Sequence, residues 1–142
     1  MRVSTKGRYA LRLLIDLAER RAEGFVPLKE IAARQNISKQ YLEQIVSLLQ
    51  TSDMLVANRG KQGGYMLARE PSKCTVREVL RATEGSLAPV ACLEGPVNNC
   101  EMAASCRTLP VWEGLGKVVA EYLDGITLQD ILETRGADHY VI

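Results

Sequence analysis

Apolar residues recur at helical spacing in several segments of the chain, and glycine, proline or asparagine separates these segments. Residues 9–22 carry such an apolar face, and Gly24 follows them as a stop signal. A second, short helix is predicted with Pro27 in its first turn, where proline costs no hydrogen bond. Asn36 tolerates the left-handed backbone of a tight turn. The pattern therefore predicts two helices followed by such a turn.

A third helix is predicted over residues 38–52, with Ser38 as its N-cap. The serine hydroxyl can accept a hydrogen bond from a backbone N–H group that is left unpaired at the start of a helix. Two short extended segments, 54–57 and 65–67, flank a turn rich in glycine, which is typical of a β-hairpin. The turn carries two cations on a glycine frame that we expect to be flexible.

The second half of the chain is predicted to be helical around one long loop. The sequence from Thr75 fits a capping box at the start of a helix, and residues 85–106 lack periodicity. A long helix with one apolar stripe is predicted after Pro110, and a last short helix from Thr127. The expected fold class is mostly α with a small β-hairpin wing.

The composition is that of an ordinary globular protein. The chain has 142 residues, of which 46% are hydrophobic and 25% charged, and this length suits one domain or a small domain with an arm. No apolar run reaches the roughly 18 residues that a membrane span needs. The first residues lead into an amphipathic segment rather than a signal peptide, so we expect a cytoplasmic protein.

The net charge of +1 conceals an uneven distribution of charge. Residues 1–73 hold 13 Lys and Arg against 7 Asp and Glu, whereas residues 74–142 hold 5 against 10. The first part is thus at +6 and the second at −5. A basic first half favours a nucleic-acid-binding face there, and chance clustering on a solvated surface is the alternative.

Two short helices joined by a tight turn and followed by a basic hairpin are the parts of a winged helix-turn-helix domain, which we place at residues 1–84. The start of helix 38–52 would read base edges in the major groove, and the wing would reach the adjacent minor groove or backbone. Taken singly, each feature has a plainer alternative as a solvated helix face or an ordinary turn. The predicted DNA-binding residues are Lys6, Arg8, Ser38, Lys39, Gln40, Tyr41, Glu43, Gln44, Arg59 and Lys61.

Three cysteines, Cys92, Cys100 and Cys106, fall within 15 residues of the loop that we place at 85–108. A loop can wrap three thiolates around one metal centre, and thiolates hold both iron–sulfur clusters and structural zinc. The alternatives are zinc, or three unligated thiols that are open to oxidation. Cys74, just before a helix cap, is interpreted as a structural residue.

Three stretches, Ser4 to Leu11, Tyr41 to Gln44 and Arg59 to Tyr65, resemble one family of proteins. It is the family of small bacterial winged-helix regulators that includes the iron–sulfur regulator IscR, the nitric-oxide sensor NsrR and the cysteine-metabolism repressor CymR. The resemblance implies a homodimeric transcription factor that binds palindromic double-stranded operator DNA. It also implies that residues 109–142 form a dimerisation helix and a C-terminal tail.

The resemblance to the three-cysteine members implies an iron–sulfur cluster, of the 2Fe-2S type, bound by Cys92, Cys100 and Cys106. Its assembly or loss would modulate operator binding. The chain departs from the family at the fourth ligand, because IscR-like members have a histidine at the position of Leu109 and NsrR-like members an aspartate at that of Arg8. The alternatives for the fourth ligand are Glu94, Glu101, Cys74, His139 or an exogenous thiol.

A second interpretation is a cluster-free repressor, since the chain also resembles the cysteine-metabolism branch, which lacks the three-cysteine loop. Members of that branch partner with cysteine synthase, whose active site accepts C-terminal tails ending in isoleucine. The tail here, expected to be mobile from Gly136, ends in Tyr140, Val141 and Ile142. A redox-thiol sensor is the third interpretation.

No enzyme is indicated by the sequence. Its one histidine, His139, lies in the expected tail, and we find no nucleophile–base pair, P-loop or HExxH pattern. Electron transfer through a cluster would leave the recognition helix and the wing unexplained.

Overall fold

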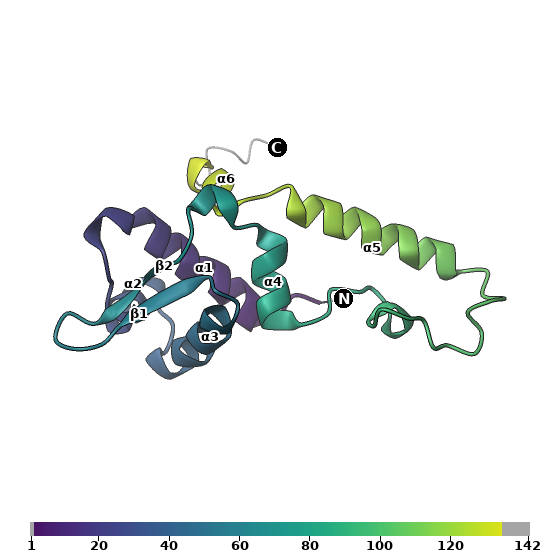
Figure 1. Ribbon diagram of the computed structural model, residues 1–142, viewed down its shortest axis with the longest axis horizontal. Coiled ribbons are helices and arrows are strands. Elements are labelled where there is room, and N and C mark those ends of the chain that lie inside the picture. Colours follow the sequence, from purple (N-terminus) through teal and green to yellow (C-terminus); the bar gives the residue numbers. More distant parts are fainter. Residues whose placement is uncertain (1, 135–142) are drawn as a thin grey trace.

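The structure is a computed structural model that describes residues 2–134. Its helices and strands follow one another in the order that the hydrophobic pattern predicts (Figure 1). Short 3-10 turns lie at Arg21–Glu23, Pro71–Lys73 and Ala91–Leu93. The elements are α1 (Thr5–Glu19), α2 (Leu28–Gln35), α3 (Lys39–Thr51), β1 (Leu55–Asn58), β2 (Gly64–Leu67), α4 (Val76–Glu84), α5 (Leu109–Asp124) and α6 (Leu128–Glu133).

One hydrophobic core joins the first three helices, the hairpin and α4. The apolar faces of α1, α2 and α3 meet there through side chains such as Leu13, Ile31 and Leu42, which are fully buried. Helix α6 returns to the same core, because Leu128 is also fully buried and Thr127 bridges to Thr75. Helix α5 and residues 85–108 extend away from this body as an arm (Figure 1). In the described part of the chain, no helix is long and apolar enough to cross a bilayer.

Several local signals of the sequence, three helix caps and one turn, are confirmed. Ser38 Oγ accepts a hydrogen bond from the backbone N–H of Tyr41 at 3.1 Å, as expected of an N-cap. Both predicted capping boxes, at Thr75 and Thr127, are present. Asn36 has a φ of 53°, so it forms the left-handed turn between α2 and α3.

The prediction for the first helix was wrong at both ends. The helix runs over Thr5–Glu19 instead of 9–22, and residues 21–23 tighten into a 3-10 turn. Residues 5–8 carry too little apolar periodicity to be recognised as helical, and a distant carboxylate stabilises this first turn, as described below. Pro27 lies one position earlier than predicted, at the N-cap of α2.

The two strands of the hairpin are held by backbone hydrogen bonds, and the glycine frame that we expect to be flexible forms the turn between them, residues 59–63. Strands β1 and β2 pair antiparallel, and the backbones of Tyr65 and Val26 exchange two hydrogen bonds of 2.9 Å. A Cβ atom on Gly64 would lie 2.3 Å from the carbonyl oxygen of Val26, so no larger residue fits without moving the backbone. Among the three hairpin glycines at positions 60, 63 and 64, Gly60 is the one with a positive φ, 115°, and it needs the conformational freedom of glycine.

Candidate DNA-binding face and cysteine segment

Helix α3 presents a polar face at its N-terminal end. Its opposite face is fixed by buried apolar residues such as Leu42 and Ile45, so the orientation of the polar face is determined by the core. The predicted α3 residues that are exposed to solvent are Ser38, Lys39, Gln40, Glu43 and Gln44. Gln40 and Gln44 are available to base edges or phosphates, whereas the hydroxyl of Ser38 is engaged as the N-cap and keeps only its proton to donate. Lys39 and Glu43 lie 4.0 Å apart in an exposed pair of little energetic weight.

Tyr41 is positioned by helix α1. Its ring packs edge-on against the ring of Tyr9, with 5.7 Å between the ring centroids. The guanidinium of Arg12 lies 5.1 Å from the centroid of the Tyr9 ring and donates a hydrogen bond of 3.1 Å to the side chain of Gln35. Tyr41 is therefore partly buried, and its contact with Tyr9 connects the start of α3 to α1.

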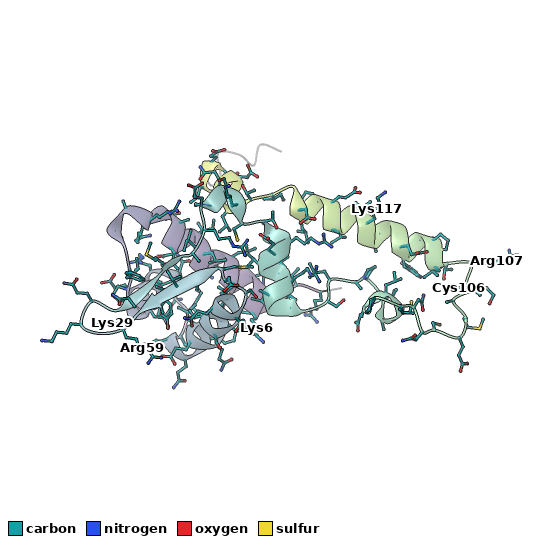
Figure 2. The ribbon with its side chains drawn as sticks, viewed as in Figure 1. Lys6, Lys29, Arg59, Cys106, Arg107 and Lys117 are labelled. Atoms are coloured by element: carbon teal, nitrogen blue, oxygen red, sulfur yellow. The ribbon has the colours of Figure 1, made fainter. Side chains whose placement is uncertain are left out.

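The wing and α3 line one hollow of about 520 Å³. Lys39 and Arg59, both predicted as DNA-binding residues, lie on its walls together with Glu43. Lys29 of α2 also lines this hollow, and it was missed because an exposed lysine on a short helix cannot be told from a solvated face. Figure 2 shows Lys29 and Arg59 close together at the same end of the molecule. Three cations thus line this hollow, one each from α2, α3 and the wing.

The first turn of α1, which carries Lys6 and Arg8, is capped by a residue of α4. Glu84 Oε1 accepts hydrogen bonds from the Ser4 hydroxyl at 2.6 Å, the Ser4 N–H at 3.0 Å and the Gly7 N–H at 3.1 Å. A carboxylate at a helix N-terminus is stabilising, because it complements the unpaired N–H groups and the helix dipole. Glu84 therefore connects the end of α4 to the basic start of α1.

Replacing Glu84 with glutamine should loosen this first turn. The charge on the cap is lost, so we expect the free energy of unfolding to fall by about 0.5–2 kcal/mol. Thermal unfolding would measure this loss. Glu19→Gln, at the C-terminal end of the same helix, is the matched control, since the side chain of Glu19 is 56% exposed and forms an ion pair with its neighbour Arg20. Equal effects of the two substitutions would contradict the capping role of Glu84.

A buried ion pair connects α1 to the helix-turn-helix. Asp16 is 1% exposed, and its carboxylate accepts hydrogen bonds from Arg34 at 2.7 and 3.1 Å and from Gln35 at 2.9 Å. Burial alone would raise the pKa of Asp16, but these hydrogen bonds and the charges of Arg34 and Arg20 outweigh it and lower the pKa. The sequence offered one sign of this role, because Asp16 falls on the apolar face of α1 beside Leu13 and Leu17.

The three cysteines of residues 85–108 are only partly brought together. Cys92 and Cys100 line one hollow, which Cys106 does not reach. The thiol of Cys106 lies 3.4 Å from the Thr108 hydroxyl, and this contact, with backbone N–H groups at the start of α5, lowers the pKa of Cys106. Within residues 2–134, no three Cys, His, Asp or Glu side chains are grouped so that they could hold a metal ion.

Cys74 stands apart from these thiols. Its side chain is 3% exposed in the main core, and burial raises its pKa to about 11. A thiol that stays protonated in an apolar environment is a poor ligand and a poor nucleophile. Its interpretation as a structural residue agrees with this burial.

The predicted apolar stripe of α5 faces solvent in the single chain. Val118 is 63% and Tyr122 is 67% exposed, and Val111, Trp112 and Leu115 are also exposed on the same helix. None of the residues of α5 is buried. An exposed apolar stripe of this kind is typical of an interaction surface.

Comparison with known proteins gives a consistent set of matches. The profile of the Rrf2 family, described as an iron-dependent transcriptional regulator, matches residues 3–134. The regulator CymR of Bacillus subtilis is 40% identical over 131 residues, which is 92% of this chain and 89% of CymR. The solved structure of CymR from B. subtilis, described as the global cysteine regulator, has a TM-score of 0.76, and the match covers 94% of this chain and 97% of the CymR chain.

Two proteins named IscR match as well. The structure of IscR from T. potens has a TM-score of 0.73 at 37% identity and covers 99% of this chain and 97% of its own. The IscR of Klebsiella pneumoniae is 36% identical over 145 residues, which is 98% of this chain and 88% of that protein. The chain is thus similar to both kinds of regulator to nearly the same degree.

Proposed function

Because the chain belongs to the Rrf2 family of transcriptional regulators, we propose that it is a homodimeric DNA-binding regulator whose operator affinity responds to an iron–sulfur cluster on its three-cysteine loop. The observation that carries the DNA-binding part is the shared hollow between α3 and the wing. Lys29, Lys39 and Arg59 line it, and the exposed polar start of α3 lies beside it. Cations at this end would neutralise phosphates, while side chains such as Gln44 would read bases.

The homodimer is supported by helix α5. Its exposed apolar side chains would be covered by a second copy of the chain, and this removes apolar surface from water. Two copies would also present two recognition helices to a palindromic site, which multiplies the specificity that one module can reach.

The proposed cluster is supported by the chemistry of the three thiols that would bind it. Cys92, Cys100 and Cys106 are free thiols on an irregular segment, and thiolates are the usual ligands of iron–sulfur clusters. The described conformation does not group the three thiols, so binding would require this segment to rearrange. When bound, such a cluster supplies redox-active iron. The segment itself joins α4 to α5, so its conformation can influence both.

Operator affinity should differ between protein with and without the cluster. A coupling of about 1–3 kcal/mol corresponds to a change of roughly 5–150-fold in DNA affinity. The experiment compares protein purified without oxygen, the same protein after iron removal, and the triple variant Cys92→Ala, Cys100→Ala and Cys106→Ala. Iron and sulfide content are measured on each sample. Equal operator affinity of all three samples would remove the sensing part of the proposal and leave the DNA-binding part intact.

A second candidate is a cluster-free regulator of cysteine metabolism, which the 40% identity to CymR favours. A colourless, iron-free sample from the same purification would support it. Its proposed partner, cysteine synthase, would bind Tyr140, Val141 and Ile142, which lie outside the described residues, as does His139. Deleting these last three residues should abolish binding of the enzyme, and unchanged binding would end this candidate.

A further inference from the structure

A half-open cavity of about 290 Å³ lies where α4, α5 and the start of the cysteine segment meet. Gly116 of α5 lies against Pro89, so the helix and the segment are in contact on one side. Arg77 of α4 forms an ion pair of 2.7 Å with Asp124 of α5, which connects the two helices on another side. The volume is at the lower end of the roughly 300–1,000 Å³ of ligand pockets, so only a small molecule would fit.

The walls of this cavity carry polar groups of both charges. Arg81 lines it from α4 and Glu94 from the cysteine segment, and neither has an ion-pair or side-chain hydrogen-bond partner among residues 2–134. The Nε atom of Arg77 is buried and has no hydrogen-bond partner in the same part of the chain. The hydroxyl of Ser86 accepts one bond from Ala88 and keeps its proton to donate.

A ligand carboxylate would accept hydrogen bonds from Arg81 and Ser86, since guanidinium groups pair well with carboxylates. Arg77 lines the same wall, but its Nε atom is buried and its guanidinium is paired with Asp124, so it supports the wall without meeting the ligand. A ligand ammonium group would satisfy Glu94. The remaining walls include Leu87, Pro89 and Leu93, which suit a short apolar or weakly polar side chain.

We propose that this cavity binds a small zwitterionic α-amino acid. Its carboxylate lies at Arg81 and Ser86, and its ammonium group at Glu94. The ligand thereby joins the cysteine segment to α4. A simple carboxylate lacks the group for Glu94, and a simple amine lacks the group for Arg81.

Binding of an amino acid in this cavity can affect the DNA-binding face through helix α4. Arg81 lies on the same short helix as Glu84, whose carboxylate caps the first turn of α1. A ligand that fixes α4 would therefore stabilise the turn that carries Lys6 and Arg8. This coupling rests on the proposed function, whereas binding of the amino acid does not.

The test measures binding without DNA. The protein as purified, with its iron content determined, is screened by thermal shift and equilibrium dialysis against free glycine, alanine, serine, threonine, cysteine and valine. We expect at least one to bind, and serine has two matched analogues, ethanolamine without the carboxylate and glycerate without the ammonium group. Both analogues should bind at least tenfold more weakly than the amino acid.

The variants Arg81→Gln and Glu94→Gln should each weaken binding at least tenfold. Arg21→Gln and Glu113→Gln, exposed residues that do not line the cavity, should leave it unchanged. If no small amino acid binds, or if Arg81→Gln binds like the unaltered protein, the inference is wrong. Equal binding of glycerate would overturn the role of Glu94 and with it the amino-acid assignment.

A parallel operator titration separates this inference from the proposed function. An operator-binding protein that takes up no amino acid would overturn the cavity ligand alone. A protein that binds an amino acid but no operator would overturn the proposed function alone.

Discussion

Replacing Asp16 with asparagine should lower the free energy of unfolding by about 3 kcal/mol, near the lower end of the cost of breaking a buried ion pair. Asp16 is 1% exposed, whereas the side chain of Arg34 is 30% exposed and keeps part of its hydration. The variant loses the negative charge of the Asp16 carboxylate, which accepts hydrogen bonds from Arg34 and Gln35. Chemical denaturation at a fixed protein concentration would measure the loss.

Glu30→Gln is the matched control for this substitution. Glu30 contacts the same Arg34 at 3.8 Å, but its side chain is 54% exposed, so we expect a loss of less than about 1 kcal/mol. Similar losses for the two variants would show that burial does not set the strength of the Asp16 pair.

The contribution of Asp16 to the stability of the protein depends on pH. The pKa of Asp16 is lowered in the folded protein, so its contribution to stability is present above the ordinary value of 3.8 and is lost as the pH falls through the lowered pKa. The stability difference between the unaltered protein and Asp16→Asn should therefore shrink in acid. A difference that grows as the pH falls would contradict the lowered pKa.

The double variant Gln44→Ala and Arg59→Ala should lose most of its specific operator affinity. Loss of a base contact at Gln44 costs about 1–3 kcal/mol and relaxes specificity at one position of the operator. Loss of a phosphate contact at Arg59 weakens binding to all sequences and lowers the salt slope by about 1. The two losses should add, since the residues lie on separate elements, α3 and the wing.

Operator titrations at several salt concentrations would separate the two effects. Lys117→Ala is the control, because this exposed lysine lies on α5, away from Arg59 (Figure 2). Unchanged operator affinity of the double variant, with folding intact, would overturn the assignment of α3 and the wing as the DNA-binding face.

The features that the sequence predicts well depend on neighbouring residues. Ser38, Thr75 and Thr127 cap their helices through residues three positions away, and Asn36 forms its turn alone. The order of the helices and the hairpin could be predicted because hydrophobic periodicity is also a pattern among neighbouring residues. The DNA-binding residues proposed from that order remain predictions, and the variant above tests two of them.

The features that the sequence did not predict depend on distant residues. The start of α1 is capped by Glu84, 80 positions from Ser4, and no local pattern carries that information. Asp16 meets Arg34 from another helix, so its burial becomes visible only in three dimensions. The spacing of three cysteines names possible ligands but not their distances, which depend on the path of an irregular segment.

The tight packing of the wing also limits how this protein can be redesigned. A Cβ atom on Gly63 would lie 2.7 Å from the carbonyl oxygen of Asn58 and 2.9 Å from that of Gly60, so Gly63, like Gly64, does not accept a side chain unless the backbone moves. A library that aims to change operator preference should randomise Arg59, Lys61 and Gln62 and keep the glycines constant. Variation at the glycines would mainly yield misfolded clones, and selection would then report on folding instead of on recognition.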